Sequence, residues 1–299
     1  MVIYFSILYF WNGFNYDNNF IINLFKNTNY KYSNNINICD LLICGPFILE
    51  NDYNFIKEKK CKKYLYITEP IEINPTYKYC YLLYQNNIFN KIIGCINNNL
   101  SMNLYKYPLY ILYFNINNNY LFNNINEDIK TKDINKKFCC LISTHDTWNT
   151  RKPIYEKLKN IGHITCPSNL LNNCSNEELN NIGNIAYIKQ FIFHICSENS
   201  QTNVKGYITE KIMNCCMGGA IPIYCGWFDE IDEKVFNKNR ILFYDSKDEK
   251  SLSQVYKKVN ELMEDKEKLK DFYQQNIFMD SAYDTIQEMN NNLINLFKI

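Results

Sequence analysis

The sequence predicts an α/β protein made of two doubly wound, Rossmann-type domains that face each other across a cleft. Short apolar runs of strand length recur along the chain and are separated by polar or helix-forming segments, a pattern typical of open parallel sheets. One stretch in the second half reads strand, helix, strand, the unit that connects right-handedly in such sheets. With 299 residues, 46% of them hydrophobic, the chain is long enough for two domains with a core each.

The N-terminal half contains several candidate strands. Residues 1–11 are apolar but too short to span a bilayer, and they lack a basic flank and a small-residue cleavage site. We therefore expect them to form the first strand. The apolar runs 41–44, 64–68 and 91–95 predict further buried strands. We expect the asparagine-rich stretch 115–137 to be the interdomain linker.

The C-terminal half begins with a predicted strand at 137–143. A helix is expected at 153–158, because Pro153 suits the first helical position. The next strand is expected at 163–166. Arg151 lies at the junction of the first strand and the helix, which makes it a candidate for contact with a phosphate group.

Residues 191–225 are the most informative part of the chain. The apolar run 191–196 predicts a buried strand, and after a polar loop Thr209 is a candidate N-cap for a helix that continues to Met217. Gly218 and Gly219 provide a stop, and residues 220–225 predict the next strand. Ligands of parallel sheets bind beyond the carboxyl ends of the strands, where the loop 198–211 falls.

That loop has an unusual chemical content. It offers an amide at Asn199, a hydroxyl at Ser200, a phenol at Tyr207, a carboxylate at Glu210 and an ammonium at Lys211. Unpaired amide protons and the helix dipole favour anions at a helix N-terminus, so a diphosphate is a natural ligand. Glu210 would accept hydrogen bonds from sugar hydroxyls. The alternative is a solvated helix start whose neighbouring charges bind nothing.

The order of three elements resembles the donor-binding signature of the α1,3/α1,4-fucosyltransferase family, glycosyltransferase family 10. Family members carry Phe-Glu-Asn-Ser, then Tyr-(Ile/Val)-Thr-Glu-Lys, then Ala-(Val/Ile)-Pro-(Val/Ile)-Tyr. Here the corresponding residues are 197–200, 207–211 and 220–224. Ser197 replaces the usual Phe, and the gap between Gln201 and Tyr207 is longer than usual.

The resemblance implies a GT-B-like fold and an enzyme that moves fucose from GDP-fucose to a hydroxyl of a glycan acceptor. It also implies that the arginine before the first helix contacts the donor diphosphate. The donor-binding residues expected on this basis are Arg151, Glu198, Asn199, Ser200, Tyr207, Thr209, Glu210 and Lys211. Two alternatives stay open: a transferase with another nucleotide-sugar donor, such as a hexosyltransferase, and a catalytically inactive carbohydrate-binding relative.

We expect three segments in the domain organisation. Residues 1–130 would form the acceptor-side domain, and residues 136–265 the nucleotide-sugar-binding domain. Residues 266–299 are helical in pattern and are expected to pack back on the first domain, as such tails often do in two-domain transferases.

The expected reaction needs no metal ion and no cofactor beyond the nucleotide sugar. Negative charge grows on the leaving diphosphate as the glycosidic bond breaks, and preorganised cations stabilise that charge. Arg151 and Lys211 can fill this role. The acidic run 229–233 is expected to start a solvent-facing helix rather than to hold a metal.

The resemblance also implies inversion at the anomeric carbon, which requires a carboxylate that takes the proton of the acceptor hydroxyl. Glu69 is the first candidate, because it follows a predicted strand and resembles the family's N-terminal glutamate element, and Glu72 is the second. Asn97 lies near the position where a bacterial family segment carries an acidic residue, and an amide cannot act as this base. Either Glu69 or Glu72 has the role, or the acceptor has changed or the protein is inactive.

Composition excludes several other classes of function. With a net charge of +1, the chain has no strong positive electrostatic potential to attract the phosphate backbone of nucleic acid, so DNA or RNA binding is disfavoured. Neither Gly-x-Gly-x-x-Gly nor a Walker-type loop occurs, which disfavours dinucleotide oxidoreductases and NTPases. His145, in a polar loop after a strand, is expected to be an ordinary loop residue, with a contact to donor or acceptor as the alternative. His194, within an apolar strand, is expected to be a core residue with satisfied nitrogens.

The thirteen cysteines are odd in number and scattered without a Cys-x-x-Cys motif, and there are only three histidines. This pattern favours neither a zinc site nor a disulfide framework, and it suits a reducing compartment. We expect a soluble, cytoplasmic or membrane-peripheral protein without a transmembrane segment. Its oligomeric state is not indicated.

Overall fold

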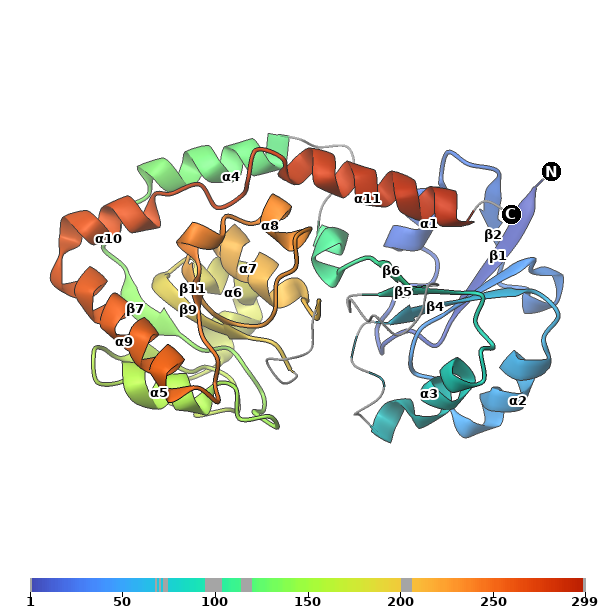
Figure 1. The fold of residues 1–299 in the computed structure, drawn as a ribbon, viewed down its shortest axis with the longest axis horizontal. Coiled ribbons are helices and arrows are strands. Elements are labelled where there is room, and N and C mark those ends of the chain that lie inside the picture. The colour runs from blue at the N-terminus through green and yellow to red at the C-terminus, as the bar shows by residue number, and fades with distance from the viewer. Residues whose placement is uncertain are drawn as a thin grey trace. The chain divides into compact units, whose positions relative to one another are not determined.

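Two parallel sheets organise the chain in the computed structural model (Figure 1). The structure describes residues 2–67, 69, 71, 75–94, 104–113, 120–199 and 206–297. Residues 1–112 and 287–299 form one compact unit, and residues 113–286 form the other. This architecture confirms the predicted α/β class with doubly wound parallel sheets.

The first unit has a sheet of order β2-β1-β3-β4-β5-β6, in which every described pairing is parallel. Its strands are β1 (Ile3–Leu8), β2 (Tyr30–Tyr32), β3 (Leu41–Cys44), β4 (Lys62–Ile67), β5 (Lys91–Gly94) and β6 (Leu104–Lys106). Its helices are α1 (Phe20–Phe25), α2 (Glu50–Glu58) and α3 (Lys78–Gln85), with short 3-10 turns η1 (Ile36–Ile38), η2 (Pro75–Tyr77) and η3 (Leu109–Tyr113). The apolar N-terminus forms β1, as predicted.

The end of the last helix, α11 (Ala282–Phe297), completes the first unit. Four tyrosines of the N-terminal segment donate their hydroxyls to it. Tyr105 binds the carbonyl of Met289 at 2.9 Å, and Tyr107 binds Oδ1 of Asn290 at 2.7 Å. The hydroxyls of Tyr30 and Tyr64 donate to the carbonyls of the last two described residues. The tail expected at 266–299 therefore divides, because α10 (Lys266–Tyr273) belongs to the second unit.

The second unit has a parallel sheet of order β11-β10-β9-β7-β8. Its strands are β7 (Lys137–Cys140), β8 (Ile164–Thr165), β9 (Phe191–Ser197), β10 (Ile221–Cys225) and β11 (Leu242–Phe243). The other elements are α4 (Tyr120–Thr131), α5 (Lys152–Leu158), α6 (Glu177–Ile188), α7 (Glu210–Gly218), α8 (Asp232–Val235), η4 (Lys238–Arg240) and α9 (Glu249–Glu264). Strand β8 pairs with one edge of β7, and β9 pairs with the opposite edge of β7. The direction in which strands are added to the sheet therefore reverses between β7 and β9.

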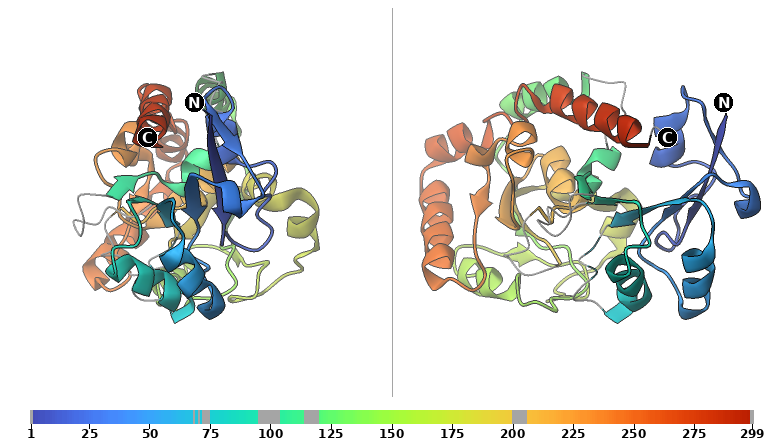
Figure 2. Two further views of the ribbon diagram at one scale, coloured as in Figure 1. Left: turned by 90° about the vertical axis from the view of Figure 1, so that its right-hand side faces the viewer. Right: turned by 45° about the vertical axis from the view of Figure 1, so that its right-hand side comes forward.

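Right-handed crossovers in opposite directions place α5 and α7 on opposite faces of this sheet. Helix α9 packs against α5, and α6 packs against α7, so each face is covered (Figure 2). Residues of β9 and β10 are buried throughout, as expected for strands covered on both sides. The core of the unit lies along these two strands.

The β9–α7–β10 segment has the predicted local structure. Thr209 is the N-cap of α7, and its hydroxyl accepts from the backbone N–H of Lys211. Gly219 ends the helix in the left-handed conformation, at φ +78°, and donates its N–H to the carbonyl of Cys216. The helix is thus defined at both ends by its own sequence.

The stretch 115–137, expected to be a linker, contains the helix α4 instead. Phe122, Asn126 and Ile129 form a buried stripe at helical spacing. The amide of Asn126 accepts from the backbone N–H groups of Ile277 and Phe278 and donates to the carbonyl of Phe278. The prediction was wrong because one asparagine occupies a core position through these hydrogen bonds and hides the apolar pattern.

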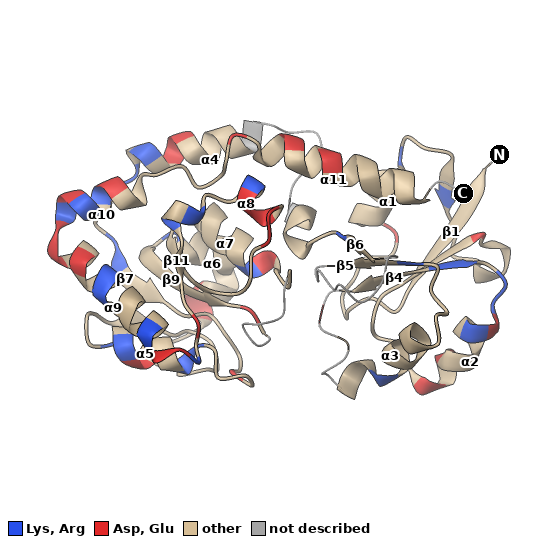
Figure 3. Cartoon of the chain, viewed as in Figure 1, with Lys and Arg blue, Asp and Glu red and all other residues tan. Residues whose placement is uncertain are grey.

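Charge on the surface helices is mixed in sign. Basic and acidic residues alternate along α9 and α10 (Figure 3). Across the described residues, no helix has the length and apolar character that crossing a bilayer demands.

Candidate active site

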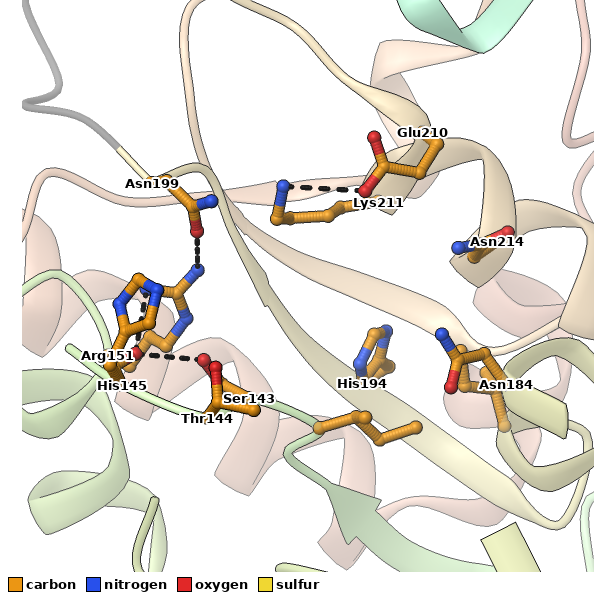
Figure 4. Close-up of a pocket in the computed structure, with 12 residues that line it drawn as sticks. Ser143, Thr144, His145, Arg151, Asn184, His194, Asn199, Glu210, Lys211 and Asn214 are labelled. Atoms are coloured by element: carbon orange, nitrogen blue, oxygen red, sulfur yellow. Dashed lines mark hydrogen bonds and ion pairs between the residues drawn. The ribbon is translucent and has the colours of Figure 1, made fainter. Parts of the chain in front are cut away.

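A pocket of about 230 Å³ opens at the carboxyl ends of β7 and β9, where the strand order of the second unit reverses (Figure 4). In doubly wound sheets this switch point is the usual ligand site. Four segments supply the pocket: the loop after β7, the strand β9 with the residues that follow it, and facing positions of α6 and α7. The lining residues are Ile142, Ser143, Thr144, His145, Arg151, Asn184, Ile188, His194, Asn199, Glu210, Lys211 and Asn214.

Arg151 is held firmly at one end of the pocket. The residue is 3% exposed, and its Nη2 donates to the carbonyl of Ser197 at 2.6 Å and to Oδ1 of Asn199 at 3.0 Å. Sequence reasoning missed Asp146, whose carboxylate lies 3.6 Å from Nη1 of Arg151. The same carboxylate accepts backbone N–H groups of residues 150–152 at the start of α5. The guanidinium is thereby preorganised.

Ser197 and Tyr244 support this arrangement from behind. The hydroxyl of Tyr244 donates to the carbonyl of Thr150 at 2.9 Å, so the Ser197 hydroxyl, which contacts the same phenol oxygen, acts as donor to it. Ser197 therefore links β9 to the residue preceding Arg151. A phenylalanine at this position could not make that hydrogen bond.

One face of α7 lines the opposite side of the pocket. Glu210 and Asn214 lie one turn apart on this face, and Lys211 extends beside them (Figure 4). The ammonium of Lys211 lies 3.0 Å from the hydroxyl of Thr209 and 3.5 Å from a carboxylate oxygen of Glu210. Lys211 is partly exposed, so its charge is presented to the pocket.

Three residues expected to bind donor lie behind the pocket wall instead of lining it. Glu198 is 2% exposed, and its carboxylate accepts from the backbone and hydroxyl of Thr209 at 2.9 and 2.6 Å and from the hydroxyl of Tyr224 at 2.9 Å. Tyr207 is buried as well. Glu198 and Thr209 therefore hold the start of α7 in place through these hydrogen bonds.

His194 differs from its expected role. It is 6% exposed and lines the pocket, yet neither ring nitrogen has a hydrogen-bond partner among the described residues. The prediction of a satisfied core histidine was therefore wrong. Asn184 was also missed: it follows Gly183, whose φ of +77° interrupts α6 and turns the next residue toward the pocket.

The remaining predicted residues lie elsewhere. Glu69 is half-buried and follows β4 in the first unit. Ser200, Glu72 and Asn97 fall outside the described residues. Their assignments stay predictions.

The acidic run 229–233 leads into the short helix α8, and Glu230 and Glu233 are exposed, as predicted, but one member of the run faces inward. Asp232 is fully buried, and its carboxylate accepts from the backbone N–H of Asp229 at 3.0 Å. Within the described residues, no group of three or more His, Cys, Asp or Glu side chains is arranged to hold a metal ion.

Comparison with known proteins adds independent findings. Residues 130–292 match the model of the family described as glycosyltransferase family 10 (fucosyltransferase), C-terminal. No curated protein sequence matches the chain significantly.

Solved structures resemble the whole chain. A crystal structure of an α1,3-fucosyltransferase is 17% identical, with 98% of this chain and 90% of that chain covered and a TM-score of 0.66. The structure described as α1,3-fucosyltransferase with GDP-fucose has the same identity and TM-score, and covers 100% and 92%. A mutant of S. aureus TarM in complex with UDP and other ligands is 13% identical, covers 87% and 55%, and has a TM-score of 0.52. These likenesses agree with a GT-B-like fold.

Proposed function

Because the chain belongs to glycosyltransferase family 10, we propose that it transfers fucose from GDP-fucose to a hydroxyl of a glycan acceptor. Membership makes the chain a glycosyltransferase, and the choice of donor is the proposed part. A similar structure described as an α1,3-fucosyltransferase with GDP-fucose supports this choice.

The observation that carries the proposal is the pairing of two cationic side chains on one switch-point pocket. Arg151 and Lys211 both line it, and α7 begins beside them. When the bond between the anomeric carbon and the phosphate oxygen breaks, negative charge accumulates on the departing diphosphate. A fixed guanidinium and an ammonium stabilise that charge, so we propose that the reaction proceeds without a metal ion.

The proposed reaction inverts the anomeric carbon. A carboxylate takes the proton from the acceptor hydroxyl, the acceptor oxygen bonds to the anomeric carbon, and GDP leaves with the electron pair of the broken bond. We propose Glu69 as this base, with Glu72 as the second candidate. Glu69 lies two residues after the end of the buried strand β4, a position from which loops of parallel sheets present catalytic groups.

Donor binding and transfer test the proposal together. Saturating GDP, at about 100 times its dissociation constant, should stabilise the protein by about 2.7 kcal/mol, and UDP should stabilise it less. Incubation with GDP-fucose and a panel of glycans should then yield a fucosylated product, and turnover should be unchanged in excess EDTA. Stabilisation by UDP but not by GDP would remove the fucose assignment, and loss of turnover in EDTA would remove metal independence.

A further inference from the structure

The imidazole of His194 is the least explained group in the pocket. Buried polar atoms are almost always hydrogen-bonded, and an exception needs a physical reason. Nδ1 and Nε2 of His194 lack a partner among the described residues, although the residue is 94% buried. Figure 4 shows the ring on the pocket floor, between the Arg151 end and Asn184. A ligand in the pocket would supply the missing partner.

The charge state of His194 limits what that ligand group can be. Burial, and secondly the positive charge of Arg151, lower the pKa of His194 to about 3. At neutral pH the ring is therefore uncharged, with one donor nitrogen and one acceptor nitrogen. Such a ring suits a neutral group that both donates and accepts, rather than a phosphate.

Besides the charged Arg151, Glu210 and Lys211, neutral side chains line the pocket with His194. Asn214 of α7 and Asn184 of α6 each offer an amide, which has both donors and an acceptor. Ile142 and Ile188 add apolar surface to the same pocket. Apolar walls with a few convergent neutral polar groups are the usual environment of a flat heterocycle, whose faces are apolar and whose edge forms hydrogen bonds.

We propose that His194 binds the edge of the donor's nucleobase and contributes to donor choice. The inference rests on the proposed function, because it takes the ligand to be a nucleoside diphosphate sugar. With the diphosphate at Arg151 and Lys211, the base and the transferred sugar lie on opposite sides of the phosphates. The sugar must stay accessible to an acceptor hydroxyl, whereas His194 lies at the buried floor. The base is therefore the part that reaches His194.

The test compares ligands that do and do not carry a base. His194→Phe keeps a ring of similar shape and removes both hydrogen-bonding nitrogens. Titration calorimetry with GDP should show binding weakened about tenfold, the effect of one or two buried hydrogen bonds. Inorganic pyrophosphate, which lacks the base, should bind within about twofold of the unmodified protein. His163→Phe, at an exposed histidine outside the pocket, is the matched control and should change neither value.

Other outcomes separate the possible errors. Equal weakening of GDP and pyrophosphate would mean that His194 acts through Arg151, and weakening of GDP-fucose without weakening of GDP would place it against the sugar. Either result overturns the inference. If the unmodified protein binds UDP and not GDP, the fucose proposal fails, and the His194 comparison is made with UDP and pyrophosphate. His194→Gln, which keeps a donor and an acceptor, should recover part of the affinity that His194→Phe loses. If the Phe variant does not fold, His194→Leu, which also lacks hydrogen-bonding groups, replaces it.

Discussion

Replacing Glu198 by glutamine tests whether this buried carboxylate holds the donor loop together. Its Oε1 accepts from the backbone of Thr209 and from the hydroxyl of Tyr224, and its Oε2 accepts from the Thr209 hydroxyl and lies 3.5 Å from the ammonium of Lys211. Glutamine can keep the two Oε1 contacts with its carbonyl. Its amide nitrogen cannot accept from Thr209, and it faces Lys211 without a negative charge.

The loss is one charge-assisted hydrogen bond, worth about 1.5–3 kcal/mol, and a weakening of the two that remain. We expect Glu198→Gln to lower the free energy of unfolding by about 2–3 kcal/mol, measured by urea denaturation. At roughly 2–4 °C per kcal/mol for a unit of this size, the melting temperature should fall by roughly 4–12 °C.

Glu210→Gln is the matched control for this measurement. Glu210 lies at the same 3.5 Å from the Lys211 ammonium, but its side chain is 33% exposed, whereas that of Glu198 is 2% exposed. A partly exposed ion pair contributes at most about 1 kcal/mol, so the control should be close to the unmodified protein. If the two variants lose equal stability, the structural role assigned to Glu198 is wrong.

Three further predictions follow from the contacts described above. Arg151→Lys should weaken GDP binding about 10- to 100-fold in calorimetry, because lysine lacks the planar fork that binds a diphosphate; unchanged binding would refute its role. Glu69→Gln should lower kcat about 10²- to 10⁴-fold without weakening GDP binding, and if only Glu72→Gln does so, the base is Glu72. Burial, and secondly the charge of Lys132, lower the pKa of Lys136 to about 8. As the pH rises, the folded state therefore loses this proton at a lower pH than the unfolded state does. The free energy of unfolding that this group contributes should therefore rise between pH 8 and its usual pKa of 10.5. Any gain in the free energy of unfolding of Lys136→Met over the unmodified protein, measured by urea denaturation, should be smaller at pH 10 than at pH 7. A larger gain at pH 10 would contradict this pH dependence.

The sequence predicted the fold best where local signals agree. Residues 191–225 combine an apolar run, the N-cap Thr209 and the stop at Gly219, and the strand–helix–strand unit formed there as expected. Where asparagine replaces apolar residues the pattern fails. Asn126 packs into the core through hydrogen bonds to a segment 151 residues away, which no local signal shows.

The residues of the site that follow directly from the predicted strands and helices could also be predicted from the sequence. Arg151, Asn199, Glu210 and Lys211 line one pocket, as expected for polar residues that follow neighbouring strands. Position alone could not distinguish Glu198, which faces inward, from residues that line the pocket. Asn214 lies four residues after Glu210 and could have been found from helical spacing. Asn184 and His194 could not be found from local spacing. The orientation of Asn184 depends on the bend at Gly183, and that of His194 depends on the packing of β9.

The tyrosine contacts to α11 have a consequence for how the protein is made. Residues 105 and 107 are translated before residues 289 and 290, which carry the groups that accept from the hydroxyls of Tyr105 and Tyr107. Domains usually fold in order as they emerge. Here these two tyrosines gain their partners only once residues more than 180 positions further along the chain have been translated. We therefore expect the first unit to complete its contacts after residues 113–286 of the second unit have been made.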